Sequence, residues 1–189
     1  MEINAGSSGR FSFHGIDEES FVTVERGLKE KVGMLARRDG VNALKGMFTA
    51  PTDASRGSFT EEKYQIGAAI GWGGAQWVDN IYEVSPNLPI DACHQLTFED
   101  PGNDAFWSVT VYNGYGFMFD DLASVSATST EPNKDGTFTL SFGCGTLASN
   151  NIRTANESGV FNLAIRHYRP GIKVRDEGYR LLPFLRVVK

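Results

Sequence analysis

Histidines and aspartates are the residues of this chain that could do acid–base chemistry. The three histidines among 189 residues, His14, His94 and His167, lie far apart in the sequence. A histidine beside a carboxylate can act as a general acid or base in a hydrolase or an isomerase. The candidates for such a pair are His94 or His167 with Asp104, Asp120 or Asp121.

The same aspartates also have a simpler interpretation as turn residues. Asp120 and Asp121 are adjacent, and neighbours along a strand point to opposite faces, so they do not form a catalytic dyad by themselves. Asp104 follows Pro101 and Gly102 and is expected to shape that turn. A metal site would require the histidines to converge with Asp or Glu, and no close spacing demands it, so neither a metal nor a cofactor is predicted.

Aromatic residues beside glycines suggest a different kind of site. Trp72 stands among three glycines, and Tyr112 and Tyr115 flank an Asn-Gly pair. Exposed rings stack on sugars or other flat apolar ligands, whereas buried rings belong to a core. These three aromatics are the predicted ligand-binding residues, and the leading hypothesis is a non-catalytic module that binds a small molecule or a glycan, or that serves assembly. The glycines around Trp72 lack the lysine and the spacing of a phosphate-binding loop.

Composition narrows the classes of partner. The net charge of −5 and the pI of about 5.2 argue against nucleic-acid binding, which needs clustered Lys and Arg. No apolar run approaches the roughly eighteen residues that span a bilayer, so no membrane span is predicted. The first residues lack the basic and apolar regions of an export signal, and the compartment stays open. Cys93 and Cys144 allow one disulfide or two free thiols; buried structural cysteines are expected, and whether the two are bonded stays open.

The elements that position these residues begin with helices. Apolar residues at three- and four-residue steps predict an amphipathic helix over 17–38, with acids at its start and bases at its end. A Ser-Phe-Thr-Glu capping box opens a second helix over 58–70. The first helix is expected to bury one stripe against the sheet or against a second copy, which leaves a homo-oligomer open; the stripe is Phe21, Val24, Leu28, Val32 and Leu35.

From about residue 90 the apolar period changes to two, which indicates strands. An Asn-Gly pair predicts a hairpin between 105–112 and 115–119, and Pro183 within the last strand predicts either an edge position or a bulge. The fold class is therefore α+β, with an antiparallel β-sandwich or jelly-roll-like body after an N-terminal helical segment. The expected strands are 93–98, 105–112, 115–119, 137–142, 160–168 and 181–188. The expected divisions are a flexible leader (1–15), a helical segment packing on the sheet (16–75) and the β-sandwich domain (76–189).

Three segments of the second half resemble one bacterial family. Residues 104–112 (DAFWSVTVY), 135–140 (DGTFTL) and 159–170 (GVFNLAIRHYRP) resemble, in order, motifs of the domain of unknown function 1214. The resemblance implies a jelly-roll-like β-sandwich and no catalytic residues, and the family often follows domain of unknown function 1254 in exported proteins. Residues 151–154 (NIRT) depart from the family's usual Asn-Trp-Leu-Pro. That departure predicts an altered site if the tryptophan lines one in relatives.

Overall fold

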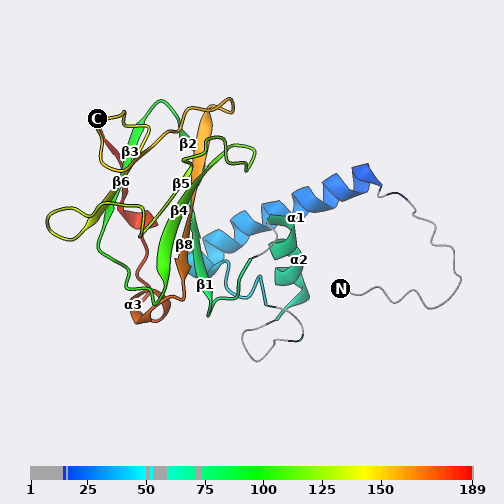
Figure 1. Ribbon diagram of the computed structural model, residues 1–189. Coiled ribbons are helices and arrows are strands. Elements are labelled where there is room, and N and C mark those ends of the chain that lie inside the picture. Colours follow the sequence, from blue (N-terminus) through cyan, green and yellow to red (C-terminus); the bar gives the residue numbers. More distant parts are fainter. Residues whose placement is uncertain (1–14, 16, 50–51, 53–58, 71–73, 189) are drawn as a thin grey trace, which may run out of the picture.

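Two β-sheets form the body of the protein, and two helices stand to one side of it (Figure 1). The computed structural model describes residues 15, 17–49, 52, 59–70 and 74–188. Sheet A has the strand order β1-β8-β4-β5, with β2 also paired to β8, and sheet B has the order β7-β6-β3-β9. The strands of sheet A are β1 (Asn80–Val84), β2 (Leu88–Pro89), β4 (Phe106–Asn113), β5 (Ser124–Ser126) and β8 (Val160–Tyr168). The strands of sheet B are β3 (Cys93–Phe98), β6 (Phe138–Phe142), β7 (Asn151–Ile152) and β9 (Leu185–Val188).

The predicted α+β class is confirmed at this level, with antiparallel pairing everywhere among the described strands except between β6 and β7, which are parallel. One apolar core receives side chains from both sheets. Trp107 and Phe161 enter it from sheet A, and Leu140 and Phe142 enter it from sheet B. Burying a large apolar side chain of this kind contributes about 1.5–3 kcal/mol, so the shared core is the main stabilising element of the body.

The predicted hairpin strand over 115–119 is wrong. The Asn113 side chain instead closes a local loop, because its Oδ1 accepts hydrogen bonds from the backbone N–H groups of Tyr115 and Phe117, both at 3.0 Å. The strand that does pair with this side of β4 is β5, which places Ser126 opposite Ser108.

The last predicted strand is shorter than expected. Residues Leu182–Phe184 form a 3₁₀ turn, with Pro183 inside it, and only Leu185–Val188 pair as β9. Proline has no N–H to donate to a ladder, which explains why the strand starts after it. The edge position is confirmed, since β9 is the last strand of sheet B.

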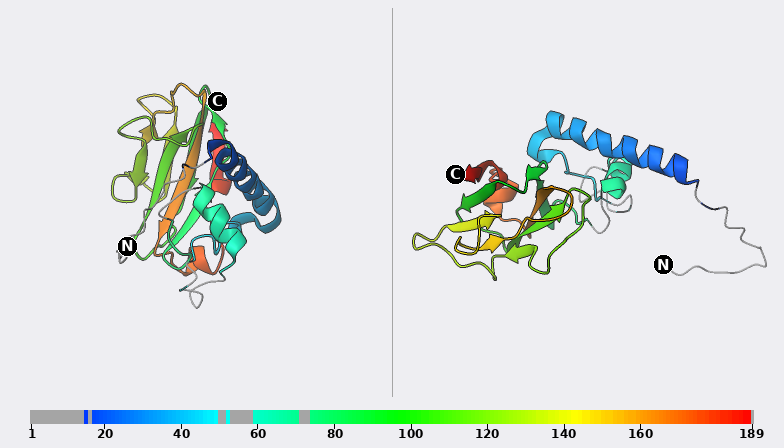
Figure 2. Two further views of the ribbon diagram at one scale, coloured as in Figure 1. Left: turned by 90° about the vertical axis from the view of Figure 1, so that its right-hand side faces the viewer. Right: turned by 90° about the horizontal axis from the view of Figure 1, so that it is seen from above.

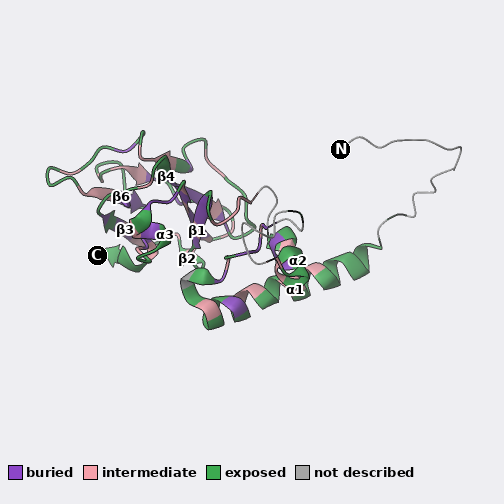
Figure 3. Ribbon diagram, turned by 90° about the horizontal axis from the view of Figure 1, so that it is seen from below, coloured by how far each residue is buried: buried purple, intermediate pink, exposed green. Residues whose placement is uncertain are grey.

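Helix α1 (Glu18–Asp39) matches the predicted helix, but most of its predicted stripe is not buried. The helix extends away from the sheets, and its first turns lie farthest from them (Figures 1 and 2). Phe21 is 53% exposed and Val24 60% exposed, whereas Leu35 is buried. In Figure 3 the buried colour accordingly concentrates in the strands, and α1 is mostly coloured as exposed.

Helix α2 (Glu61–Ile70) packs beside α1 and completes a second, smaller core. Leu35, Met47 and Ile66 are its largest buried members. Thr60 caps α2, because its Oγ1 accepts from the Lys63 N–H at 3.3 Å; Ser58, which the sequence proposed for the cap, lies outside the described residues. A Cβ atom added at Gly67 would lie 2.5 Å from the Met47 carbonyl oxygen, so this close approach requires glycine.

Cys93 and Cys144 form a disulfide, one of the two alternatives that the sequence left open. The bond joins the start of β3 to the loop after β6, across 51 positions of sequence. The pairing arises because β3 and β6 are hydrogen-bonded neighbours, a juxtaposition that sequence spacing does not reveal. In the described part of the chain, no helix is both long and apolar enough to cross a membrane.

Candidate functional site

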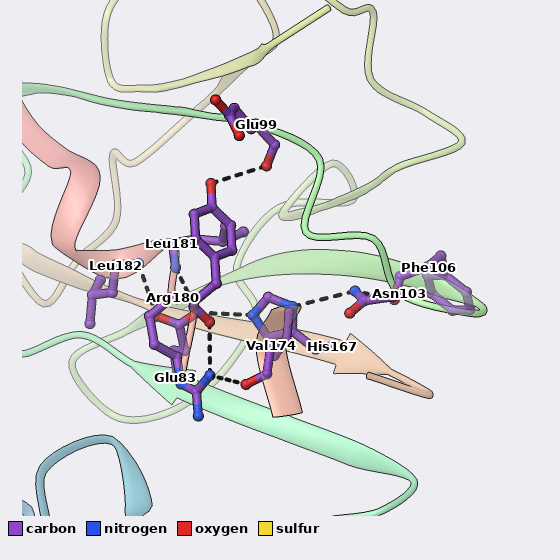
Figure 4. A network of polar contacts seen from close by, with 10 residues as sticks. Glu83, Glu99, Asn103, Phe106, His167, Val174, Arg180, Leu181 and Leu182 are labelled. Atoms are coloured by element: carbon purple, nitrogen blue, oxygen red, sulfur yellow. Dashed lines mark hydrogen bonds and ion pairs between the residues drawn. The ribbon is translucent and has the colours of Figure 1, made fainter. Parts of the chain in front are cut away.

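The strongest candidate for acid–base chemistry is a buried, hydrogen-bonded histidine–carboxylate pair between two strands of sheet A. His167 of β8 is fully buried, and its Nε2 lies 2.9 Å from Oε1 of Glu83 on β1 (Figure 4). Ile81 stands directly opposite His167 in the β1–β8 register, so Glu83 is two residues further along on the same inner face. The strand pairing therefore brings the two side chains together although 84 positions separate them.

Every polar atom of this pair already has a protein partner. Glu83 Oε1 accepts a hydrogen bond from the Leu181 N–H at 2.8 Å, and Oε2 accepts one from the Leu182 N–H at 2.9 Å. Asn103 donates from Nδ2 to His167 Nδ1 at 3.3 Å, which leaves Nε2 to carry the proton that points at Glu83. The arrangement anchors residues 181–182 to sheet A and leaves no polar atom of either side chain unpaired.

The other predicted acid–base residues occupy structural positions. The structure pairs His167 with Glu83 and brings none of the predicted aspartates to a histidine among the described residues. Asp120 Oδ1 accepts from the Leu122 N–H at 2.9 Å, as in a turn, and its Oδ2 lies 3.6 Å from Arg153 Nη1. Asp104 and Asp121 are exposed.

His94 is also buried, and its ring contacts only neighbouring protein groups among the described residues. Its Nδ1 lies 3.0 Å from the Ala92 carbonyl oxygen, and its ring stands edge-on to Phe161 with 5.5 Å between ring centroids. Such contacts are those of a hydrogen-bonded core histidine. His14 lies outside the described residues. Among the described residues, no cluster of three or more His, Cys, Asp or Glu side chains is arranged to hold a metal ion.

A groove runs between the outer face of sheet A and the helical segment. It consists of two adjoining hollows of about 680 Å³ and about 440 Å³, sizes typical of small-molecule sites. The hollows share four lining residues, two from the helical segment and two from β1: Leu44, Ile70, Tyr82 and Val84. The first hollow continues along α1, and the second continues across β8 to β4.

The second hollow contains one charged side chain among its described lining residues, Arg166 of β8. Its Nη1 donates to Thr110 Oγ1 at 3.0 Å, and its Nη2 donates to the Tyr112 hydroxyl at 2.9 Å. The guanidinium also lies 5.9 Å from the centre of the Tyr112 ring. These partners are all neutral, so they orient the guanidinium without cancelling its charge.

The first hollow has a more deeply buried arginine at its wall. Arg180 is 5% exposed, and its Nη1 donates to the carbonyl oxygens of Val174 and Tyr179 at 2.6 and 2.8 Å. Burial lowers the pKa of Arg180, and the charge of Glu83 opposes that effect. Its Nε is buried and has no hydrogen-bond partner within the described ranges.

The predicted aromatic ligand residues divide between the groove and the surface. Tyr112 is half-buried and lines the second hollow. Tyr115 is 67% exposed and lines neither hollow, and Trp72 lies outside the described residues. Sequence reasoning missed Tyr82 because β1 was not expected, and it missed Arg166 because an arginine on the outer face of a strand looks like ordinary solvated surface. Arg180 lies in the loop after α3 (Ile172–Arg175), where no local pattern indicates that it is buried.

One protein family matches a segment of the sheet-rich part of the chain. Residues 87–172 match the family described as a protein of unknown function (DUF1214). These residues belong to the DUF1214 family. The resemblance seen in the sequence is thereby confirmed. The DUF1214 segment contains Tyr112 and Arg166 and so supplies part of the sheet wall of the groove, whereas the helical wall and β1 precede it.

Solved structures show what the fold is similar to. The crystal structure of the VPA0106 protein from Vibrio parahaemolyticus matches 95% of this chain at 18% identity with a TM-score of 0.62. The chain spans about half of that protein, 47% of its length. An uncharacterized protein from Burkholderia cenocepacia is 22% identical over 62% of this chain and 31% of its own, with a TM-score of 0.48. No curated protein matches this chain.

Proposed function

We propose that this protein is a non-catalytic binding module whose ligand occupies the groove between sheet A and the helical segment. The observation that carries the proposal is the pair of adjoining hollows, which share Leu44, Ile70, Tyr82 and Val84. Concave, largely apolar sites with a few oriented polar groups are the usual form of small-molecule sites. Tyr112 and Arg166 are the oriented polar groups here.

The competing hypothesis of a hydrolase or isomerase needs an accessible histidine–carboxylate pair. His167 and Glu83 are both buried, and their polar atoms are taken by each other, by Asn103 and by two backbone N–H groups. A general base must come within hydrogen-bond reach of the proton that it removes. This closed environment favours binding over catalysis.

The glycan form of the hypothesis concerns a different surface. A sugar needs an exposed ring to stack on, and of the described candidates Tyr115 is the exposed one, beside Gly116. The groove, with Leu44, Ile70 and Val84 in its walls, suits an apolar small molecule better. We therefore assign the ligand to the groove and use Tyr115→Ala to test the glycan alternative.

The domain division and the finer fold description belong to the same proposal. We hold the body (76–189) to be an antiparallel β-sandwich of jelly-roll type and the helical segment (16–75) to be a layer on its sheet A, after a leader (1–15). A core shared by Trp107 of sheet A and Leu140 of sheet B supports the sandwich. Groove walls drawn from both parts support the layer.

The binding proposal is tested with a neutral apolar dye and a variant that fills the groove. Val84 lines both hollows and is exposed enough to accept a larger side chain. We expect saturable Nile red fluorescence with the natural protein and at least tenfold weaker binding by Val84→Trp. Val187→Trp is the matched control, because Val187 is an exposed valine of edge strand β9 in sheet B. Absence of saturable binding, or equal binding by Val84→Trp, would refute the proposal.

A further inference from the structure

The charges around the groove differ between its two hollows. In the first hollow the positive charge of Arg180 is opposed by the carboxylate of Glu83, which also lines that hollow. In the second hollow Arg166 is the one charged residue among the described lining residues. Within the described lining, the second hollow therefore combines one positive charge, with no acidic side chain beside it, and an apolar space.

The neutral hydrogen-bond partners of Arg166 fix the orientation of its guanidinium, which can then bind an anion. Thr110 and Tyr112 accept one hydrogen bond each, from Nη1 and Nη2, and a guanidinium has five N–H donors in a planar fork. No hydrogen bond from the remaining donors to a described residue is found, so they can be offered to a ligand. The Tyr112 oxygen accepts from Arg166, so its own proton is free to be donated to the same ligand.

The apolar walls define the other end of the ligand. The first hollow, which adjoins the second through Ile70 and Val84, is lined by Val32 and Ala36 of α1 and by Leu182 and Pro183 before β9. An alkyl chain in this space would bury its surface against aliphatic side chains at both walls. The groove therefore combines the positive charge of Arg166 in the second hollow with the largely aliphatic walls of the first hollow.

We propose that the ligand of the groove is a long-chain carboxylate, with its carboxylate on Arg166 and Tyr112 and its alkyl chain in the first hollow. This inference rests on the proposed function of the groove. A carboxylate matches the planar guanidinium fork and carries the single negative charge that one arginine neutralises. A phosphate monoester carries more charge than the second hollow offsets.

The decisive experiment compares probes that share one alkyl chain and differ in the head group. Binding of dodecanoate, dodecanol and dodecyl phosphate is measured by displacement of Nile red. We expect the natural protein to bind dodecanoate about tenfold more tightly than dodecanol and more tightly than dodecyl phosphate. Added salt should reduce the preference for dodecanoate over dodecanol, because ions screen a half-exposed charge.

Single substitutions then test which side chains cause the preference for dodecanoate over dodecanol. Arg166→Gln should lose the advantage of dodecanoate over dodecanol while it keeps Nile red and dodecanol binding, which also shows that it is folded. Tyr112→Phe keeps the ring and should weaken dodecanoate several-fold. Arg153→Gln removes an equal charge from an exposed arginine and should change neither probe.

The outcomes separate this inference from the function on which it rests. Equal binding of dodecanoate and dodecanol, or a dodecanoate preference that survives in Arg166→Gln, overturns the carboxylate assignment and leaves groove binding intact. Tighter binding of dodecyl phosphate overturns it in favour of a phosphate head group. If neither Nile red nor dodecanol binds saturably, both the groove-binding proposal and the carboxylate proposal are refuted. If the solution mass is that of two chains and no probe binds, the groove is instead covered by a second copy.

Discussion

The body and the helical segment differ in how their side chains are buried. Among the described residues, twelve buried apolar side chains form the core between the sheets and four form the core of the helical segment, so the larger hydrophobic contribution lies in the body. The body also contains the disulfide and the Glu83–His167 pair. Figure 3 shows the same contrast, with exposed positions along most of α1. Because most of the stabilising burial lies within the body, the boundary between the body and the helices does not have to be tightly packed. The groove lies at this boundary.

The largest effect that this comparison predicts comes from the buried Glu83–His167 pair. Glu83→Ala should lower the free energy of unfolding by about 3–5 kcal/mol, because His167 and two backbone N–H groups lose their acceptor inside the protein. Urea denaturation measures the change. Glu177→Ala, at an exposed position, serves as the control and should stay within about 0.5 kcal/mol. An equally small loss for Glu83→Ala would mean that the pair does not anchor residues 181–182.

The disulfide gives the next largest expected effect. Replacing Cys93 and Cys144 together by alanine opens a loop of 51 positions in the unfolded chain, which should cost about 2–4 kcal/mol. Denaturation of the natural protein with and without a reductant gives an independent value, and the double variant should no longer respond to the reductant. A reductant response that persists in the double variant would contradict this account.

Truncation of matched aliphatic residues compares the two cores directly. Leu140→Ala in the body should cost about 3–5 kcal/mol, and Ile66→Ala in the helical segment should cost closer to 2 kcal/mol, because a small cluster can collapse around the lost atoms. Hydrogen exchange should show the matching order, with faster exchange in α2 than in β4. Equal losses with equal exchange would show that the helical segment and the body unfold as one unit.

The sequence predicted those elements whose pattern is local. Strands such as β4 and β8 alternate clearly because each has one face in the core, and α1 has the period and the charged ends of a helix. Strand β1 escaped prediction because it is short and turns the polar Glu83 inward, which removes the apolar alternation. The pattern in α1 identified a stripe but not what would cover it, and Phe21 remains exposed.

The candidate site depended on contacts between distant positions. His167 was recognised, but its partner is 84 positions away and was assigned to the wrong residues, because only the β1–β8 register shows which carboxylate it meets. Tyr112 was predicted from its glycine neighbour, and the structure places it in the groove. Arg166 became a candidate only when its neutral partners Thr110 and Tyr112 were seen.

The smallest expected effect concerns the exposed end of α1. Phe21→Ser with Val24→Ser should change the free energy of unfolding by about 0.5 kcal/mol or less, since neither side chain is buried in the described structure. Light scattering before and after the double substitution tests the hypothesis that this stripe pairs with a second copy. If the natural protein has the mass of two chains and the variant the mass of one, Phe21 and Val24 are covered in the dimer, and the variant's stability should then depend less on protein concentration. If both have the mass of one chain, α1 contributes to the protein through Leu35 and the groove wall at Val32 and Ala36, and its first turns are dispensable for stability.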